Sequence, residues 1–463
     1  MVLAPTATLV LAVSGARGAA AQANAQFRGG PAHQGSYGPS HGPELEGLQW
    51  RFATRGGVTA SPTVADGVVY VGSGDGGFRA LDLENGALLW SFQADAPVDA
   101  TAAVADGRVF VGDHAGTYYA LDAGSGDVVW TVRTAPAIPF PWGHESGQVY
   151  TSSPTVVDGT VVVGGADGRL HALEAATGRR RWVRELGARI PGSPAVEGAT
   201  VVVGDAAGRV HALSLRDGSV RWTFETTGAG LESADFGFDR TTVQSSPAIR
   251  DGRVFVGARD GFLYALDLRT GEEVWRFDHE VSWVNTSPAV ADGVVYAGSS
   301  DGAFVQAVDV RTGAERWRRP EAGVVWASPT LAGDVLYYGN FGGTLYALDR
   351  STGDSLWSYR TGGGILSSPV VAGDLVVVGS RDGGVYALRT GSRPVHRAVF
   401  HDPALADAAW APAPDSLAAW FETVGYVRLD ADGLATFLSA RVEDGEPSVV
   451  VFAPDHLPPD ALA

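Results

Sequence analysis

Two stretches of the sequence carry aromatic and acidic side chains in a concentration that suits ligand binding. They cover residues 136–150 and 227–243. Their candidate contact residues are Trp142, His144, Glu145, Glu232, Asp235 and Asp239. Tryptophan offers a large rigid contact area and carboxylates bind cations or hydrogen-bond donors, so these stretches can form a site for a peptide or a small ligand. The competing interpretation is that they are variable loops that pack their own aromatic residues.

Both stretches interrupt a repeat that fills most of the chain. One unit of this repeat starts at Ser61-Pro62, passes three Asp-Gly or Asn-Gly pairs and ends at Trp90. Such pairs supply the positive φ that tight hairpins require, and the segments between them are short and rich in valine, leucine and tyrosine. Each unit therefore predicts four short antiparallel strands. At a period near 40 residues, four strands are typical of one β-propeller blade.

Tryptophans mark the ends of the units and count the blades. They are Trp50, Trp90, Trp130, Trp182, Trp222, Trp275, Trp317 and Trp357. Trp50 has no strands of its own before it, and the last unit reaches Val395 where a tryptophan is expected. We therefore expect residues 48–52 to supply the outer strand of the last blade, which closes an all-β, eight-bladed propeller over 48–396. Each tryptophan can bury about 150–250 Å² between blades, so the series is interpreted as structural.

The unit Ala265–Trp275, with the pattern Ala-Leu-Asp-x-x-Thr-Gly-x-x-x-Trp, resembles the tryptophan-docking repeat of pyrroloquinoline-quinone (PQQ)-type propellers. Residues 27–30, Phe-Arg-Gly-Gly, are similar to the segment that precedes the first blade in exported members. The resemblance implies an eight-bladed propeller with one of two functions. Some members are dehydrogenases that hold the quinone and Ca²⁺ at the funnel face of the propeller. Others, the BamB-like branch, carry no cofactor and act as scaffolds.

A dehydrogenase of this type is expected to supply a Glu, Asn and Asp set for Ca²⁺, a catalytic Asp and often a vicinal cysteine pair, but the chain contains no cysteine. The connections between blades should reach the funnel face three residues before each Ser-Pro proline. Counted in this way, the ring comprises Thr59, Ala100, Thr151, Pro191, Gln244, Asn285, Trp326 and Leu366. Asp99, one residue earlier, is then the only acid nearby, so the ring offers few ligands for a hard dication. Gln244, Asn285 and Trp326, together with Trp283, join the candidate contact residues.

Composition and the N-terminal residues narrow the partners and the location. The net charge of −18 argues against nucleic acid, because a phosphate backbone requires a basic surface. A short apolar run over 2–13, followed by small residues, predicts a signal peptide over 1–23 and hence a periplasmic or secreted protein. No stretch is long and apolar enough to insert directly into a membrane. A leading segment over 24–47 then connects to the propeller, which we expect to be monomeric.

The repeat pattern ends near residue 397. Residues 397–400, 426–429 and 448–452 are predicted strands, and 416–424 and 431–442 are predicted helices. This β-α-β-α-β order predicts a partial α/β, flavodoxin-like domain over 397–463, which resembles the start of glutamine-amidotransferase-like or ThuA-like domains. We expect that domain to be truncated, because three strands alone would leave an exposed edge and no nucleophile elbow or catalytic cysteine is present.

Taken together, these features predict an exported, non-catalytic propeller. It would bind an envelope protein or a small ligand at the funnel face, under the two inserted loops, and would need no cofactor. The alternative is a PQQ-dependent dehydrogenase that oxidises an alcohol or a sugar with Ca²⁺. Binding of the quinone separates the two hypotheses.

Overall fold

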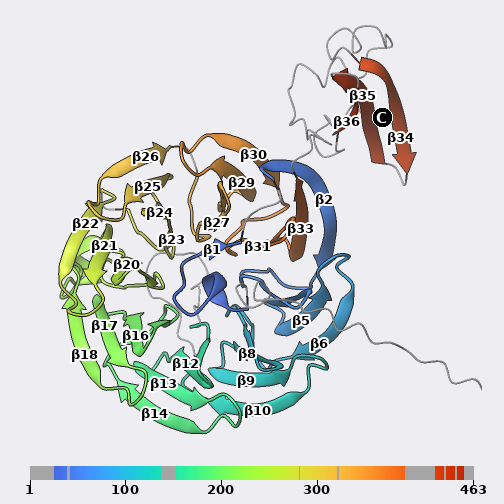
Figure 1. Cartoon of the computed structure of the whole chain (residues 1–463). Coiled ribbons are helices and arrows are strands. Elements are labelled where there is room, and N and C mark those ends of the chain that lie inside the picture. The colour runs from blue at the N-terminus through green and yellow to red at the C-terminus, as the bar shows by residue number, and fades with distance from the viewer. Residues whose placement is uncertain are drawn as a thin grey trace, which may run out of the picture.

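The computed structural model describes residues 25–38, 42–136, 152–280, 282–320 and 323–391, together with the backbone of three strands between 423 and 452. Over 25–391 the chain forms eight small β-sheets arranged around one axis, as Figure 1 shows. The predicted eight-bladed, all-β propeller is therefore confirmed. Within each blade the strands follow one another antiparallel from the axis outward, because tight Asp-Gly and Thr-Gly turns join consecutive strands.

The first four blades follow chain order. Blade 1 comprises β3 (Thr63–Ala65), β4 (Val68–Gly72), β5 (Gly77–Asp82) and β6 (Leu88–Gln93). Blade 2 comprises β7 (Ala103–Ala105), β8 (Arg108–Gly112), β9 (Thr117–Asp122) and β10 (Val128–Arg133). Blade 3 comprises β11 (Thr155–Val157), β12 (Thr160–Gly164), β13 (Arg169–Glu174) and β14 (Arg180–Glu185). Blade 4 comprises β15 (Ala195–Glu197), β16 (Thr200–Gly204), β17 (Arg209–Ser214) and β18 (Val220–Glu225).

The other four blades complete the ring. Blade 5 comprises β19 (Ala248–Arg250), β20 (Arg253–Gly257), β21 (Phe262–Asp267) and β22 (Glu273–Asp278). Blade 6 comprises β23 (Ala289–Ala291), β24 (Val294–Gly298), β25 (Val305–Asp309) and β26 (Glu315–Arg319). Blade 7 comprises β27 (Thr330–Ala332), β28 (Val335–Gly339), β29 (Thr344–Asp349) and β30 (Ser355–Arg360). Blade 8 comprises β31 (Val370–Ala372), β32 (Leu375–Gly379), β33 (Gly384–Gly391) and, from the N-terminal side, β2 (Glu44–Ala53).

The pairing of β2 with β33 closes the ring and confirms the predicted role of the first tryptophan. The two strands are antiparallel, with Trp50 opposite Ala387 and Phe52 opposite Val385. This is the register that the outer strand of every other blade adopts, for example Trp222 opposite Ala212 in blade 4. The last blade is thus built from both ends of the propeller sequence, which leaves no unpaired radial edge.

The repeated tryptophans dock each blade onto the next. Trp222 is 9 % exposed, and its Nε1 donates a hydrogen bond to the carbonyl of Leu268 at 2.9 Å. Gly271 follows in the same turn with φ of +77°, and a Cβ there would lie 2.6 Å from the Trp222 ring, so only glycine fits. Equivalent bonds to the next blade are made by Trp50, Trp90, Trp130, Trp182, Trp275 and Trp317. The structural interpretation of the series agrees with these contacts.

Trp357 differs from the other seven. It is 9 % exposed, but its Nε1 has no hydrogen-bond acceptor among the described residues. In blade 8 the position equivalent to Leu268 is held by Thr390, which lies opposite Leu45 in the ladder between β33 and β2. The turn that presents a carbonyl to the tryptophan elsewhere is replaced here by a continuous strand.

The segment that precedes the propeller crosses its centre, where Figure 1 shows it in blue inside the ring. It contains the 3₁₀ turn η2 (Phe27–Gly29) and β1 (Ser36–Tyr37), which pairs parallel with β27. Its carbonyls accept backbone N–H groups from the inner strands of five blades, from Val104, Val196, Ile249, Val290 and Leu331. We call residues 25–37 the axial segment. No sequence pattern predicts this position.

Buried polar groups fix the axial segment in place. His33 is fully buried, and its Nε2 lies 3.2 Å from the Thr155 hydroxyl oxygen. That hydroxyl already donates its only proton to the carbonyl of Pro194, so the imidazole must be the donor to Thr155. Burial lowers the pKa of His33 to about 3, and the nearby Arg28 acts in the same direction. The ring is therefore neutral and protonated on Nε2.

The C-terminal strands correct one part of the sequence-based prediction. Residues 423–452 contain β34 (Thr423–Ala431), β35 (Leu434–Glu443) and β36 (Glu446–Phe452), which form one antiparallel sheet. The predicted helix over 431–442 is wrong, and so is the parallel order, because residues 434–443 form β35, which pairs antiparallel with β34 and with β36. The predicted strands 426–429 and 448–452 lie within β34 and β36. The predicted strand 397–400 lies outside the described residues.

Candidate funnel-face site

The predicted ring of residues around the axis contains one error, the choice of Ala100 in blade 2. We call the face that carries the connections between blades the funnel face. Val58, Val98 and Val243 each donate a backbone hydrogen bond to the residue that directly follows the second strand of the preceding blade. These three positions are therefore equivalent. The next residue in blade 2 is Asp99, not Ala100. The prediction missed it because Thr101-Ala102 replaces Ser-Pro in that blade, and the ring does contain one carboxylate.

Serine hydroxyls link the blades just below this ring. The Oγ of each Ser-Pro serine accepts the backbone N–H of the equivalent residue one blade earlier, at 2.8–3.1 Å. The acceptors are Ser61, Ser153, Ser193, Ser246, Ser287, Ser328 and Ser368. We call this the serine belt. At the junction of blades 1 and 2, which lacks a belt serine, Thr59 instead donates to Asp99 at 2.6 Å.

Asp99 is therefore already engaged in holding two blades together. Its second oxygen lies 2.7 Å from Nε2 of His114, which follows β8 in the same blade. Thr59 and His114 contact different oxygens of the same carboxylate, so the Thr59 hydroxyl is not paired with the imidazole as in a Ser-His-Asp arrangement. Its geometry indicates a junction between blades 1 and 2 and no catalytic triad.

A buried cation organises the opposite side of the funnel face. Arg259, which follows β20, has a fully buried side chain. Its Nη1 lies 3.0 Å from a carboxylate oxygen of Asp239, and its Nη2 donates to Oε1 of Gln244 at 2.5 Å. The guanidinium carbon stacks over Trp283 at 4.4 Å from the ring centroid. One arginine thus joins three of the residues predicted to form the site: an ion pair with Asp239, a hydrogen bond to the amide oxygen of Gln244 and a cation–π contact with Trp283.

The second inserted loop is anchored by the same aspartate. Asp239 is 5 % exposed and accepts the backbone N–H groups of Thr241 and Thr242 at 2.9 and 3.1 Å. The loop contains the short helix α1 (Ser233–Phe236). Phe238 bridges from this helix to the core, with ring centroids 6.4 Å from Phe236 and 6.1 Å from Trp283. The loop therefore packs against blade 6 through an aromatic series.

An exposed aromatic surface begins at this loop and reappears two blades further on. Phe236 is 41 % exposed and has the Arg240 guanidinium 5.5 Å from its ring centroid. Phe341, after β28, is 39 % exposed, lies 6.0 Å from the Trp326 ring, and has the Arg381 guanidinium 5.3 Å from its own ring. The two pairs share a pattern of an exposed phenyl ring stacked by an arginine. Aromatic and arginine side chains are the residue types enriched at protein interfaces.

Asn285 lies between these two pairs in the ring order. It is 8 % exposed, and neither its amide nitrogen nor its amide oxygen has a hydrogen-bond partner among the described residues. Its ring neighbours are Gln244 in blade 5 and Trp326 in blade 7. Leaving a buried amide unpaired costs stability, so such a group is often reserved for a ligand or for water.

Other predicted residues are placed apart or are not described. Glu232 and Asp235 are exposed at the start of α1 and take part in no ion pair among the described residues. Trp142, His144 and Glu145 lie outside the described residues. The predicted set is thus gathered in part, around Asp239, Gln244, Trp283, Asn285 and Trp326.

Three contributors were missed: Arg259, Phe341 and Arg381. All three follow strand two of their blades, at the tip of a hairpin that the sequence pattern indicates only as a turn. A comparison of the eight hairpins would have found them, because the same position holds small residues in several other blades, including Gly74, Ala166, Ala206 and Ser300.

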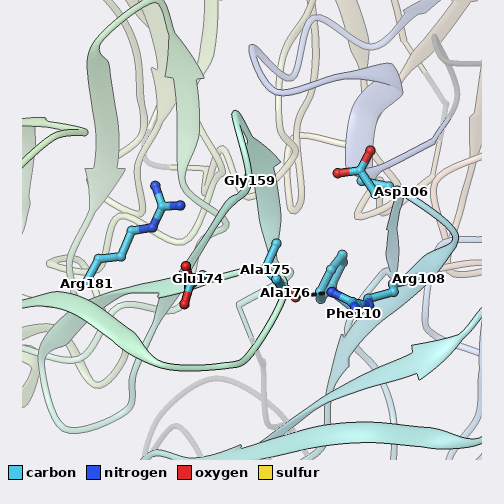
Figure 2. Close-up of a pocket in the computed structure, with 9 residues that line it drawn as sticks. Asp106, Arg108, Phe110, Gly159, Glu174, Ala175, Ala176 and Arg181 are labelled. Carbon is cyan, nitrogen blue, oxygen red and sulfur yellow. Dashed lines mark hydrogen bonds between the residues drawn. The ribbon is translucent and has the colours of Figure 1, made fainter.

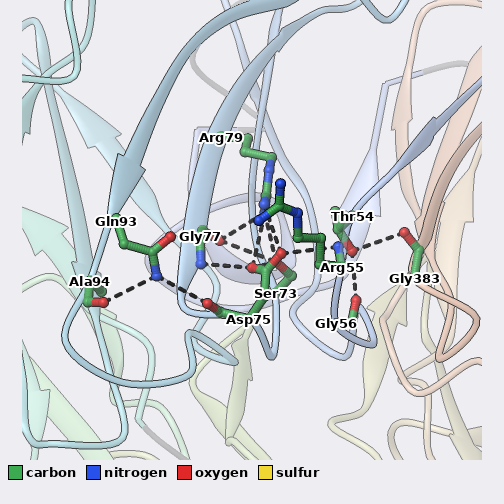
Figure 3. Close-up of polar contacts among 10 residues, drawn as sticks. All are labelled: Thr54, Arg55, Gly56, Ser73, Asp75, Gly77, Arg79, Gln93, Ala94 and Gly383. Atoms are coloured by element: carbon green, nitrogen blue, oxygen red, sulfur yellow. Dashed lines mark hydrogen bonds and ion pairs between the residues drawn. The ribbon is translucent and has the colours of Figure 1, made fainter.

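Aspartates in the same hairpins are committed to structure, as Figure 3 shows for blade 1. Asp75 accepts hydrogen bonds from Ser73, from the backbone of Gly77 and Arg55, and from Arg79 at 2.8 Å. Burial alone would raise the pKa of Asp75, but these bonds outweigh it and hold the pKa well below its usual range. The carboxylate stays ionised and saturated, so it is not a general base.

The donor set within the described residues does not fit PQQ with Ca²⁺, which the family resemblance raises as an expectation. No group of three histidine, aspartate or glutamate side chains in the described residues is placed to hold a metal ion. Asp99 and Asn285 lie in blades 2 and 6, on opposite sides of an eight-bladed ring, and Gln244 is bound to Arg259. Calcium requires six to eight oxygens that converge on one point, and these do not.

A pocket of about 280 Å³ lies between blades 2 and 3, away from the funnel-face residues, and is shown in Figure 2. Arg108 crosses it and donates to the carbonyl of Ala175 at 3.1 Å. Trp130 bonds the same carbonyl at 2.9 Å, so the pocket is a gap left by docking of the two blades. It contains none of the residues predicted to bind a ligand.

Comparison with known proteins supports the fold and identifies a family. A family model described as outer membrane protein assembly factor BamB matches residues 44–101, 84–242, 225–323 and 303–394. No curated protein matches the chain. BamB from Moraxella catarrhalis is 19 % identical with a TM-score of 0.62, covering 74 % of this chain and 99 % of that one. A quinohemoprotein alcohol dehydrogenase from Comamonas testosteroni is 18 % identical with a TM-score of 0.66, covering 84 % and 85 %.

A third structure, a europium-containing methanol dehydrogenase, is 17 % identical with a TM-score of 0.66, covering 79 % of this chain and 98 % of that one. At these identities, the likeness to scaffold and enzyme structures alike establishes the propeller and leaves the activity to be argued from the site. In the described part of the chain, no helix is long and apolar enough to cross a membrane.

Proposed function

The chain belongs to the propeller family described as outer membrane protein assembly factor BamB, and from that premise we propose that it is a non-catalytic binding scaffold. Its funnel face contacts a protein partner or a small ligand. An envelope protein is the partner that the family description suggests, and an extracytoplasmic location follows from the same description. The predicted signal peptide over 1–23 lies outside the described residues.

The observation that carries this proposal is the position of the exposed aromatic rings. Large apolar side chains are exposed at eleven described positions, and nine of them lie on the outer strands of the blades. Phe236 and Phe341 are the other two, and both lie on the funnel face, each beneath an arginine. An exposed phenyl ring held by a cation costs little entropy to immobilise, so it suits a contact surface.

Buried groups beside these rings support the same conclusion. The amide of Asn285 can donate to and accept from a peptide group, and Arg259 is held rigidly by Asp239 and Trp283. The carboxylates of Asp75, Asp239 and Asp99 are in contact with Arg79, Arg259 and His114, so these three support the hairpins, the loop and the blade junction. Burial lowers the pKa of Arg189, and Asp239 and Arg259 act on it in opposite directions, so a second cation lies near this cluster.

A paired retention experiment tests the binding surface. Immobilised native protein is compared with the double variant Phe236→Ala/Phe341→Ala in capture of envelope proteins from the source organism. The control, Leu88→Ala/Leu356→Ala, removes equally exposed apolar side chains from the outer strands β6 and β30. The proposal expects specific proteins to be retained by the native chain and the control and lost by the funnel-face variant. Equal retention by all three would overturn the funnel-face assignment.

Quinone binding tests the alternative directly. Purified protein is mixed with PQQ and Ca²⁺, and the bound chromophore and dye-linked oxidation of alcohols and sugars are measured. The scaffold proposal expects neither a stoichiometric chromophore nor turnover. A chromophore at one equivalent with oxidation of any of these substrates would refute it.

A further inference from the structure

The axial segment places one cation in the interior of the ring. Arg28 belongs to η2 and is 2 % exposed. Its segment is bonded to inner strands on several sides of the axis, so the side chain is enclosed by protein. Arg28 has φ of +59°, a conformation that residues other than glycine seldom adopt, and the bond from Gly35 N–H to its carbonyl at 2.9 Å holds it there.

No carboxylate balances this cation. Arg28 makes no ion pair with any of the described residues, and its one side-chain hydrogen bond runs from Nη1 to the carbonyl of Pro329. Its Nε and Nη2 are buried and have no acceptor within the described chain. Burial lowers the pKa of Arg28 to about 10, so the group remains charged at neutral pH. An isolated buried charge costs several kcal/mol unless it is paired.

The guanidinium lies between the axial segment and the inner strand of blade 7, because a Cβ on Gly35 would lie 2.1 Å from Nη2 and Nη1 donates to the carbonyl of Pro329. Gly35 of the axial segment bonds Leu331, whereas Arg28 reaches Pro329, two residues nearer the funnel face in the same strand region. Pro329 follows the belt residue Ser328 directly. The belt serines accept N–H groups through Oγ, and for Ser328 and its neighbours no described acceptor takes the hydroxyl proton. Near Pro329, N–H groups of Arg28 and hydroxyl protons of belt serines are therefore both left without an acceptor among the described residues.

We propose that Arg28 and the axial segment form a buried binding site for one small anion on the propeller axis, a halide or a small carboxylate. The anion would accept the N–H groups of Nε and Nη2 and neutralise the guanidinium. The site lies on the side of the serine belt away from the funnel-face ring, so it is separate from the binding surface proposed above and does not depend on it.

Anion binding should stabilise the folded chain in proportion to occupancy, because only the folded state assembles the site. The unmodified protein is heated in chloride, bromide, formate or gluconate at one ionic strength. We expect a saturable rise in Tm with chloride, bromide or formate relative to gluconate, which is too bulky for an enclosed site. The order of the halides and formate distinguishes the two classes of anion. Equal Tm values in all four salts would overturn the proposal.

Variants link the effect to Arg28. Arg28→Met removes the charge and its donors while keeping an unbranched chain, so the dependence of Tm on chloride should be lost. Arg133→Met is the control, because Arg133 is 73 % exposed on β10. It should retain the full chloride dependence. If chloride stabilises Arg28→Met as much as the native protein, Arg28 does not hold the anion.

Crystals grown in bromide test the site without any variant. We expect an anomalous peak within hydrogen-bonding distance of Nε or Nη2 of Arg28. Electron density for water alone at that position, with no anomalous signal, would contradict the proposal even if the salt series showed stabilisation.

Discussion

Side chains of the funnel face fall into two groups. One group makes hydrogen bonds that hold the fold together, and the other does not. Asp75 and Asp239 each accept several hydrogen bonds that hold a hairpin or a loop, and Asp99 accepts one from Thr59 across a blade junction. Asn285 and the exposed rings of Phe236 and Phe341 do not have such a structural use. Residues of the second kind are the ones free to meet a partner, which is why the proposed function rests on them.

Buried histidines make stability depend on pH. His279 is 1 % exposed between Phe277 and Phe304, and burial lowers its pKa to about 3, with Arg318 acting in the same direction. The unfolded chain takes up a proton near pH 6.5 that the folded chain refuses until about pH 3. The contribution of the neutral His279 to the free energy of unfolding should therefore be fully present above pH 6.5 and should decrease as the pH falls toward 3.

The pH prediction can be checked by denaturation of native protein and His279→Gln between about pH 7 and 4. The free energy of unfolding of the variant should depend less steeply on pH, by an amount that corresponds to about one proton taken up on unfolding. His33→Gln should behave in the same way, because burial lowers the pKa of that ring to a similar value. Parallel curves for all three proteins would show that neither histidine resists protonation in the fold.

The exceptional position of Trp357 gives a second prediction for single side chains. Trp222→Phe removes the bond to Leu268 and leaves a partly buried carbonyl without its partner, whereas Trp357→Phe removes no such bond within the described residues. Trp222→Phe should therefore destabilise the protein by roughly 1 kcal/mol more than Trp357→Phe. Urea denaturation of both variants measures this difference. Equal losses would mean that the docking bond contributes nothing beyond the packing of the ring.

Among the elements of the fold, the axial segment is the least regular part of the propeller and one of the most connected. It contains few residues in regular secondary structure, yet it bonds the inner strands of five blades through its carbonyls. Those N–H groups point to the axis, where no neighbouring strand can accept them. The segment thus completes the backbone hydrogen bonding of the inner strands, a requirement of any buried edge.

Glycine substitutions test this role. Gly35 has φ of +61°, and a Cβ there would overlap Nη2 of Arg28, so Gly35→Ala should displace the segment. Gly30 has an extended φ, and a Cβ there would meet no atom within 4 Å, so Gly30→Ala is the matched control. Hydrogen exchange should accelerate at the amides of Val196 and Leu331 in Gly35→Ala only. Unchanged exchange in both variants would show that the axial segment does not stabilise the inner strands.

For the molecule as a whole, one contact between β2 and β33 converts a row of blades into a ring. Every other blade is a continuous piece of chain, whereas blade 8 holds its outer strand β2 by non-covalent pairing with β33, so the ring can open when that strand separates. Opening there would expose both strand edges and the core beneath Trp50. We therefore expect closure by distant parts of the chain to make the eight blades unfold together.

An engineered disulfide measures how much closure of the ring contributes to stability. The chain has no cysteine, so a Phe52→Cys/Val385→Cys pair would form a single bridge across β2 and β33. The control pair Phe224→Cys/Val210→Cys occupies the equivalent register inside blade 4. The closure bridge constrains a far longer loop, so oxidation should stabilise it by roughly 3 kcal/mol more than the control. Similar gains in Tm for both would indicate that ring opening does not limit unfolding.

The number of blades, their strands and the closure by Trp50 could all be predicted from the sequence, because they depend on local turn chemistry repeated at a fixed period. The same repetition placed Gln244, Asn285 and Trp326 in one ring, since equivalent positions of a repeat meet at the axis. Prediction failed where repetition ends: at Asp99, where a degenerate motif shifted the count, and over residues 431–442, where the predicted helix is a strand.

Which of those residues act together depends on the tertiary fold alone. Arg259 joins Asp239, Gln244 and Trp283, and no local pattern encodes that meeting. Asp239 and Gln244 come from the connection between blades 4 and 5, Trp283 comes from the next connection, and Arg259 comes from a hairpin of blade 5. The position of residues 25–37 on the axis is likewise a property of the closed ring, which creates the unpaired N–H groups that the segment satisfies. Local chemistry repeats along the chain, but a binding site arises where unrelated segments converge.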